Sequence, residues 1–167
     1  MGLDVEGVHA RLRELRGADV GAVLGTGASA AIVVAPEHLV SVASACRDDG
    51  DLAFDCLSNL SGVDYPAEGH IQVVYHLFSY RHRHGAVLKV NANRDDPVVP
   101  SLCGVWSHAN WQEREVFDLL GVRFTDHPDL RRILMPEDWP GHPLRKDFVE
   151  PAEYHGIATS RASLLKV

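Results

Sequence analysis

The most constraining feature of this sequence is a segment, residues 126–151, that is rich in proline and yet strongly apolar. It holds five of the nine prolines of the chain. Because proline lacks a backbone N–H and fixes its φ angle, the segment cannot readily form a helix or a central strand. Its apolar side chains still need a surface to lie on, and they are Leu130, Ile133, Leu134, Met135, Trp139, Leu144 and Phe148. The sequence therefore predicts an extended segment that packs on its own domain or on another subunit.

Upstream of this segment, the spacing of apolar residues predicts three amphipathic helices. Apolar residues recur at steps of three and four over residues 4–17, 36–47 and 101–121. Asp4 and Ser101 are residue types that accept backbone N–H bonds at a helix start, so we expect them to cap the first and third helices. Gly121 is typical of the left-handed residue that ends a helix.

Alternating or β-branched runs predict four strands, over residues 30–35, 52–57, 71–80 and 86–93. The second of these runs is the weakest. The polar residues 81–85 end in glycine, as a hairpin connection does, so the last two strands are expected to pair antiparallel. The glycine-rich residues 20–29 and the polar residues 58–69 are expected to be loops.

These elements predict an α+β fold in which a mixed or antiparallel sheet of about four strands is covered by helices. On this prediction, residues 1–125 form the core domain and residues 126–167 form an extended, proline-rich C-terminal segment. A domain this small has little surface to spare for so long a segment. We therefore expect residues 126–167 to pack on partner subunits.

Composition and cysteine spacing exclude several classes of partner and site. Sixteen basic and 23 acidic residues give a net charge of -7, which opposes binding to nucleic acid or to anionic lipid. The three cysteines match no CxxC spacing, so neither a disulfide framework nor a zinc ribbon is expected, and a reduced cytoplasmic compartment fits. The charged N-terminus predicts no signal peptide. Residues 20–36 are uncharged, but they are interrupted by glycine and too short to span a bilayer.

Two short motifs suggest chemistry and are better explained structurally. Residues 25–30 carry the letters of a GxGxxA dinucleotide-binding motif, which requires a strand before it and a helix after it. A strand is expected to follow instead, so no cofactor is expected there. His82 and His84 could take part in proton chemistry. With no carboxylate or cysteine near them in sequence, we expect both to be solvated hairpin residues.

A dense set of metal-capable side chains lies farther along: Glu113, Glu115, Asp118, His127 and Asp129. A hydrolytic metal site needs three or four such groups to converge around an open position. Glu113 and Glu115 point in different directions on a helix, and only His127 supplies a nitrogen. Pairing of the carboxylates with arginine is therefore the expected arrangement.

Basic residues gather in the last third of the chain, against its acidic balance: Arg114, Arg123, Arg131, Arg132, Arg145 and Lys146. Arginine outnumbers lysine thirteen to three, and guanidinium groups suit bidentate pairs with carboxylates at interfaces. Two tryptophans lie in the same part of the sequence, and tryptophan and arginine are the residues that anchor interfaces. This composition favours an interface with another protein.

A long ordered string connects these residues with a known family. Residues 111–134 read WQEREVFDLLGVRFTDHPDLRRIL, and residues 141–148 read GHPLRKDF. Upstream, LS at 57–58, GVDY at 62–65 and VYHL at 74–77 follow in the same order. Over roughly residues 30–150, the chain resembles the C subunit, or thirty-kilodalton subunit, of respiratory complex I. It departs from the family pattern at Leu120, usually aromatic, and at Asp126, usually glycine.

The resemblance implies a non-catalytic structural subunit in the peripheral arm of a proton-translocating NADH:quinone oxidoreductase. Its implied partners are the large quinone-site subunit and the iron–sulfur subunits. Flavin, iron–sulfur clusters and quinone would be bound by those neighbours, and no catalytic residue, metal or cofactor is implied on this chain. The implied location is the cytoplasmic side of the cell membrane, as a peripheral subunit that touches the membrane only through the complex.

The resemblance also implies which charged and motif residues make ion pairs within and between subunits. These candidates are Glu113, Arg114, Glu115, Asp118, His127, Pro128, Asp129, Arg131, Arg132, His142, Pro143, Arg145, Lys146 and Asp147.

Three alternatives stay open. The same module resembles subunits of membrane-bound hydrogenases, formate hydrogenlyases and F420-linked dehydrogenases, and one subunit does not reveal the electron donor. A metal-dependent hydrolase would use Glu113, Asp118, His127 and Asp129. A generic adaptor would bind partners without any connection to redox chemistry.

Overall fold

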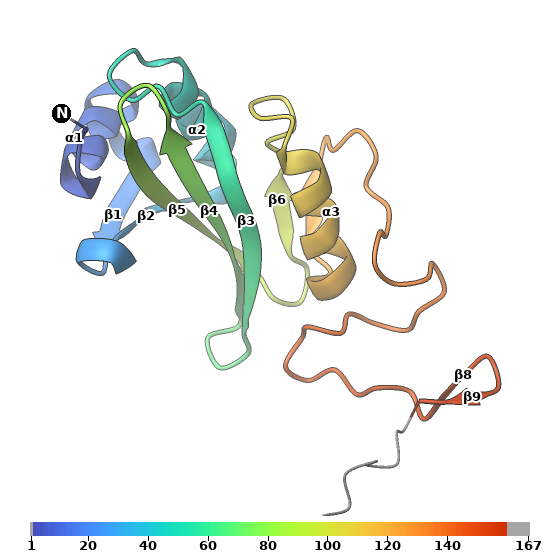
Figure 1. The fold of residues 1–167 in the computed structure, drawn as a ribbon. Coiled ribbons are helices and arrows are strands. Elements are labelled where there is room, and N and C mark those ends of the chain that lie inside the picture. The colour runs from blue at the N-terminus through green and yellow to red at the C-terminus, as the bar shows by residue number, and fades with distance from the viewer. Residues whose placement is uncertain (1, 160–167) are drawn as a thin grey trace, which may run out of the picture.

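The structure is a computed structural model that describes residues 2–159 (Figure 1). At its centre is a five-stranded sheet of β1 (Val20–Leu24), β2 (Ala31–Val34), β3 (Cys56–Tyr65), β4 (His70–Ser79) and β5 (His84–Asn93). The strands lie in the order β1-β2-β5-β4-β3, with β2 parallel to β5 and the other neighbours antiparallel. The predicted α+β fold with a mixed sheet is confirmed, with one strand more than expected.

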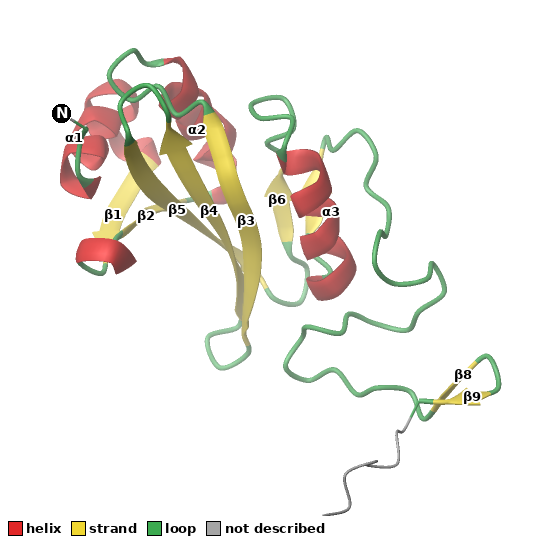
Figure 2. Cartoon of the chain, viewed as in Figure 1, coloured by secondary structure: helices red, strands yellow, loops and turns green. Residues whose placement is uncertain are grey.

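Within residues 2–159, three helices accompany the sheet: α1 (Val5–Arg16), α2 (Leu39–Asp48) and α3 (Ala109–Leu120). Short 3-10 turns lie at Gly17–Asp19, Gly27–Ser29 and Pro36–His38. Two small strand pairs complete the fold, β6 (Val98–Pro100) with β7 (Arg123–Thr125) and β8 (Glu153–Tyr154) with β9 (Ile157–Ala158) (Figure 2). As predicted, Asp4 caps α1 by accepting the Gly7 N–H, and Gly121 ends α3 with a φ of 78°.

The hydrophobic core lies between one face of the sheet and the helices. Val73 and Tyr75 of β4 are fully buried and belong to one cluster with Leu12 of α1 and Val42 of α2. Burial of aromatic rings and aliphatic side chains is the main source of stability in a domain of this size. The alternation predicted for β4 therefore places the expected side chains inside.

Helix α3 covers the same face of the sheet at its β3 end. Gly62 of β3 pairs with Val73, and a Cβ at position 62 would lie 2.4 Å from Cδ1 of Leu120. Glycine at this position thus permits α3 to approach the strand closely. The close approach sets the position of the C-terminal half of α3, on which the candidate site is built.

The loop predicted over residues 20–29 is wrong in its first half, because residues 20–24 form β1. A Cβ at Gly21 would lie 2.5 Å from the carbonyl oxygen of Val33 in β2. Glycine there reflects the close approach of two strands and not a loop.

The predicted position of β3 is also wrong. Residues 58–65, expected to be a loop, belong to the strand, and residues 52–55 lie outside it. The polar residues in this strand reflect the position of β3 at the edge of the sheet, where Ser58, Asn59 and Ser61 are exposed. An exposed edge does not need the apolar alternation by which strands are identified.

Helix α3 begins later than predicted. Residues 98–100 form β6, and the Ser101 hydroxyl donates to Glu113 at 2.6 Å instead of capping the helix. After β7, the chain runs from residue 126 to residue 152 without helix or strand, in the extended course predicted for it (Figure 1). Within residues 2–159, we find no helix that is long and apolar enough to cross a membrane.

Candidate functional site

The candidate site is the surface where the proline-rich segment lies on α3. We call residues 126–147 the strap. The strap leaves β7, follows α3 and reaches the end of β3, so it joins parts of the chain that are far apart in sequence (Figure 1). Three groups of polar contacts hold its middle and end there, and Arg114 and His127 add contacts near its start.

The first group centres on Asp118 of α3, whose side chain is fully buried. One carboxylate oxygen accepts the backbone N–H bonds of residues 133, 134 and 135 at 3.0, 2.7 and 2.9 Å. The other oxygen accepts from Arg132 at 3.3 Å. Burial raises the pKa of Asp118, but the three amides and the Arg132 charge outweigh it and leave the pKa below its usual value. Asp118 is therefore an ionised anchor for the strap.

The second group closes the C-terminal end of α3, where carbonyl oxygens lack partners within the helix. The carbonyl oxygens of residues 118–120 accept from the His142 ring at 2.9 Å, the Leu144 backbone N–H at 2.9 Å and Arg145 Nε at 2.7 Å. The Arg145 charge also suits the negative end of the helix dipole. A Cβ at Gly121 would lie 2.6 Å from the His142 ring, so glycine is required there for space as well as for its positive φ.

The third group ties the strap to the end of β3. The buried carboxylate of Asp64 accepts two bonds from Arg94, at 2.7 and 2.9 Å, and the backbone N–H of Lys146 at 2.8 Å. Arg94 also bonds Asp147 at 2.7 Å. Hydrogen bonding to Arg94 is the main reason that the pKa of Asp64 lies below its usual value, against the effect of burial.

Beneath the strap lies a buried polar cluster around Glu113, whose side chain is fully buried. Glu113 accepts from the Ser101 hydroxyl at 2.6 Å, the Leu102 backbone N–H at 2.7 Å and the Cys103 thiol at 3.5 Å. Burial raises the pKa of Glu113, and these hydrogen bonds only partly oppose it. The arrangement connects α3 with the loop that precedes it.

Burial of Glu113 predicts a particular dependence of stability on pH. Because its folded-state pKa is raised, the folded chain binds more protons at this group than the unfolded chain, so the contribution of Glu113 falls as pH rises above about 4.3. We expect the unfolding free energy of the wild type, minus that of Glu113→Gln, to be larger at pH 5 than at pH 8. Urea unfolding of both proteins at the two pH values measures the difference. An equal or larger difference at pH 8 would contradict a raised pKa.

The same cluster bears on the possibility of a metal site. Ligand atoms of Cys103, Glu113 and His127 all lie within 4.8 Å of one another. Sequence spacing did not predict that Cys103 would join the other two. However, Nδ1 of His127 accepts the Asp129 N–H at 3.0 Å, and Nε2 faces the Asn110 carbonyl oxygen at 3.1 Å. Nε2 therefore carries the proton, and neither nitrogen offers a free lone pair to a metal.

The carboxylates that a metal-dependent hydrolase would require do not converge. Asp118 is bonded to the strap amides, and Asp129 lies 3.0 Å from Arg131 and 3.6 Å from Arg114. Only His127 and Glu113 of that set lie near each other, 3.9 Å apart. The predicted pairing of carboxylates with arginine describes Asp118 and Asp129 correctly.

Arg114 links α3, the strap and an exposed aromatic ring. Its buried guanidinium donates to the Arg131 carbonyl oxygen at 3.2 Å and lies 3.6 Å from Asp129. It also lies 4.7 Å from the centroid of the Trp111 ring, in cation–π geometry. Trp111 is 64% exposed, so this stack holds an exposed tryptophan in one orientation.

Several predicted site residues lie outside these bonds, and others were missed. Glu115 is exposed and makes no ion pair within residues 2–159, Pro128 is exposed and Pro143 is half-buried. Lys146 contributes its backbone N–H and not its charge to the bonds described above. Asp64 and Arg94 were missed because a carboxylate in a strand and an arginine after another strand show no common spacing in sequence.

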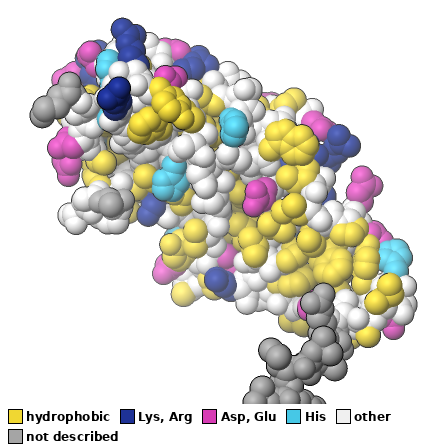
Figure 3. Space-filling model, in the orientation of Figure 1, with side chains coloured by type: hydrophobic (Ala, Val, Ile, Leu, Met, Phe, Trp, Pro, Cys, Tyr) yellow, Lys and Arg dark blue, Asp and Glu magenta, His cyan; other side chains and the backbone are white. Residues whose placement is uncertain are grey.

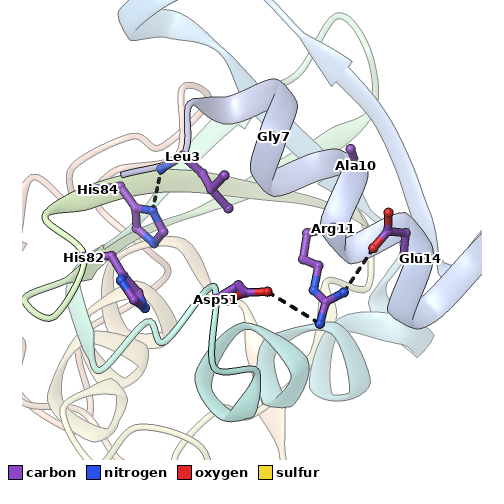
Figure 4. A pocket seen from close by; sticks show the side chains of 8 residues that line it. All are labelled: Leu3, Gly7, Ala10, Arg11, Glu14, Asp51, His82 and His84. Carbon is purple, nitrogen blue, oxygen red and sulfur yellow. Dashed lines mark hydrogen bonds and ion pairs between the residues drawn. The ribbon is translucent and has the colours of Figure 1, made fainter. Parts of the chain in front are cut away.

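A separate hollow of about 400 Å³ lies between α1 and the β4–β5 turn, lined by Leu3, Gly7, Ala10, Arg11, Glu14, Asp51, His82 and His84 (Figure 4). The expectation of a solvated His84 is wrong. Its ring is buried, Nδ1 accepts the Leu3 N–H at 2.9 Å and Nε2 bonds the Leu52 carbonyl oxygen at 2.8 Å. His84 therefore fastens the N-terminus to the sheet and has no nitrogen left for proton transfer.

Comparison with known proteins gives one consistent family. A family model described as respiratory-chain NADH dehydrogenase, 30 Kd subunit, matches residues 32–154. The C subunit of the NADH-quinone oxidoreductase of Roseiflexus sp. (strain RS-1) is 50% identical over 146 residues, which cover 85% of this chain and 84% of the relative. The protein of the same name from Moorella thermoacetica is 48% identical over 118 residues, covering 71% and 78%.

Two solved structures share the fold. A trypsin-resistant fragment (1-134) of Nqo5 superposes with a TM-score of 0.62 at 26% identity, covering 72% of this chain and 97% of that one. A chain of the membrane-bound sulfane sulfur reductase, an archaeal respiratory membrane complex, superposes with a TM-score of 0.72 over 86% of this chain and 85% of that one. At 22% identity, the second likeness concerns the fold alone.

Proposed function

Because the chain belongs to the family of respiratory-chain NADH dehydrogenase 30 Kd subunits, we propose that it is a structural subunit of the peripheral arm of a proton-translocating NADH:quinone oxidoreductase. Its role is positional. It holds the quinone-site subunit and the iron–sulfur subunits in register, so that electrons pass from NADH through flavin and clusters to quinone. The chemistry takes place in those neighbours, and this chain binds no cofactor itself.

The observation that carries this proposal is the docked strap. Several of its backbone and charged groups bond within the chain, to Asp118, to Asp64 and to the end of α3. Four large apolar side chains of the strap and the residues after it are exposed, and Figure 3 shows apolar side chains gathered on that part of the molecule. They are Leu134 (55% exposed), Leu144 (55%), Val149 (84%) and Ile157 (71%).

A large exposed apolar surface of this kind marks a protein interface. We assign residues 126–167, of which 160–167 lie outside the described residues, to contact with the large quinone-site subunit and the iron–sulfur subunits. The charged residues of the motif then act mainly by fixing the strap, which presents the apolar contacts. Membrane association follows through the complex, on the cytoplasmic side, and the chain is peripheral.

A second candidate is the equivalent subunit of a related membrane-bound complex with another electron donor, such as a hydrogenase or an F420-linked dehydrogenase. Both candidates involve the same kind of contact between subunits. An experiment that identifies the electron donor therefore distinguishes them.

The proposal is tested by recovering the tagged chain from its native membranes in mild detergent. Mass spectrometry, iron and flavin assays and NADH:quinone activity are measured on the recovered material. Co-purification of iron–sulfur and flavin subunits with NADH-dependent activity is expected. Activity with hydrogen or reduced F420 alone would favour the second candidate, and a metal-bearing monomer with hydrolytic activity would contradict both.

Introducing charge on the apolar face of the strap should weaken assembly without unfolding the chain. We expect Leu134→Glu to lower the yield of co-purified partner subunits by about tenfold, the effect of ~1.4 kcal/mol. Leu134 is 55% exposed, so the unfolding free energy of the isolated chain should change by less than about 0.5 kcal/mol. Val40→Glu on α2, where Val40 is 42% exposed, is the matched control and should leave the yield unchanged. Equal yields for both variants would contradict the proposal that the strap is part of the interface.

A further inference from the structure

Strand β3 leaves one long edge of the sheet open. β3 spans ten residues and lies at the end of the strand order. In the part of the chain that the structure describes, it pairs with β4 alone, and its backbone makes no hydrogen bond along the other edge. Unpaired N–H and C=O groups along an edge are a template for another strand.

Apart from a register shift between Leu57 and Asn59 near the start of β3, this edge lacks the features by which proteins commonly prevent such pairing. Proteins block edges with lysine, proline or short strands, and β3 contains neither lysine, arginine nor proline. Its exposed residues are small or uncharged: Ser58, Asn59, Ser61 and Val63. By contrast, β1 at the opposite edge spans five residues. The open edge of β3 is thus the accessible one for strand addition.

A small apolar hollow lies beside this edge. Its volume is about 80 Å³, and its lining comprises Leu60, Ser61, Gly62, Glu115, Val116, Leu119, Leu120 and Leu144. An apolar cavity of roughly 150 Å³ holds a benzene molecule, so this hollow accommodates the end of one aliphatic side chain. The strap residue Leu144 forms part of the rim, so the hollow continues the apolar surface of the strap.

One charge stands at the hollow. Glu115 is exposed, belongs to the lining and makes no ion pair within residues 2–159. Nearby carboxylates are already satisfied: Asp118 by the strap and Asp64 by Arg94. A partner that carries lysine or arginine would therefore complement Glu115, and an acidic partner would be repelled.

From the open edge, the hollow and the unpaired carboxylate, we propose that an extended segment of a neighbouring subunit adds to β3 as a sixth strand. An aliphatic side chain of that segment enters the hollow, and a lysine or arginine next to it pairs with Glu115. Backbone bonds supply affinity in this mode of recognition, and the side-chain pocket supplies specificity. The inference rests on the proposed function and adds a contact distinct from the face of the strap.

Site-specific photo-crosslinking tests the contact in the intact complex. Benzoylphenylalanine replaces Ser61 at the β3 edge in the tagged full-length chain, and the same residue at Ala22, exposed on β1 at the other edge, is the control. After irradiation of native membranes, the crosslinked peptide is sequenced. We expect position 61 to capture one segment of one partner subunit, with aliphatic and basic residues, and position 22 not to capture it.

A charge reversal then tests the pairing. Glu115→Arg should lower the position-61 crosslink by about tenfold, because it sets like charges against each other. Glu37→Arg is the control, since Glu37 is also exposed and makes no ion pair within the described residues. An equal loss with both variants would contradict the pairing with Glu115.

Other products would overturn the inference. A crosslink to a second copy of this chain, or to its own residues 160–167, would assign the edge to a different occupant. Complete absence of a crosslink at position 61, in material that still carries the iron–sulfur and flavin subunits, would reject strand addition and leave the proposed function standing. Loss of those subunits from the wild-type chain would instead count against the proposed function.

Discussion

Replacing Asp118 with asparagine is expected to release the strap from α3 and to lower the free energy of unfolding by about 3 kcal/mol. The fully buried carboxylate receives three backbone N–H bonds and the Arg132 charge. Asparagine keeps the shape, but it removes the negative charge that all four donors face. It therefore leaves the guanidinium without its counter-charge and weakens the three bonds to the strap.

The effect should depend on pH in a defined direction. Because the pKa of Asp118 is lowered in the folded chain, its contribution to stability is present above its unfolded-state pKa of about 3.9. That contribution is lost as pH falls through the folded-state value, so wild type and variant should converge in acid. Urea unfolding measures stability, and limited proteolysis reports cleavage within residues 126–147.

Asp129→Asn is the matched control for this prediction. Asp129 lies in the same strap, but its side chain is 48% exposed and its partners are Arg131 and Arg114. Exposed ion pairs contribute about 0–1 kcal/mol. Equal stability losses in the two variants, or an unchanged cleavage rate in Asp118→Asn, would contradict the anchoring role of Asp118.

A comparably large effect is expected from Arg94→Met. Removing Arg94 leaves the buried carboxylate of Asp64 with the Lys146 N–H as its remaining donor among the bonds described. Breaking a buried pair in this way costs about 3–5 kcal/mol, because one charge stays buried without compensation. The strap should also loosen at its end, since Arg94 bonds Asp147.

The sign of the pH dependence follows from Asp64. In the wild type the pKa of Asp64 is lowered by Arg94, whereas burial without Arg94 should raise it. The variant is therefore expected to lose most stability near neutral pH and to recover as Asp64 takes up a proton in acid. Unfolding in urea near pH 7 and near pH 4 measures both effects.

Arg123→Met provides the corresponding control. Arg123 pairs with Asp96 across exposed positions, 58% and 72% accessible. A pair of this kind contributes little in water, so its removal should change stability by less than about 1 kcal/mol. A deficit for Arg94→Met that equals the control, or that does not shrink in acid, would contradict a buried charge pair at Asp64.

Periodicity predicted the parts of the fold in which one face is buried. Helices α1 and α2 and strands β4 and β5 turn most of their predicted apolar residues to the core, so their existence and pairing followed from sequence. β1 and β3 are edge strands, and each contains a glycine, Gly21 or Gly62, at a point where a neighbouring element approaches closely. In the sequence, such a glycine suggests a loop. Edge position and tertiary proximity are not encoded in local spacing.

The candidate site was predictable by residue type more than by geometry. The ordered motif identified Asp118, Arg132 and Arg145 as partners in bonding. It did not reveal that Asp118 and Arg145 bond backbone groups of the same chain, because those contacts depend on how the strap turns. Asp126 has a φ of 60°, a conformation that favours glycine. Aspartate tolerates this left-handed backbone better than most other residues.

We propose that this chain positions its neighbours and takes no part in the chemistry. Arg145→Ala tests it most directly, because Arg145 holds the strap to the end of α3. Lys146→Ala is the control, since Lys146 bonds Asp64 through its backbone N–H. Complexes recovered from membranes carrying each variant should be counted by iron content, and their NADH:quinone turnover should be measured per complex. We expect fewer complexes for Arg145→Ala with unchanged turnover per complex, whereas full assembly with reduced turnover would contradict a purely positional role.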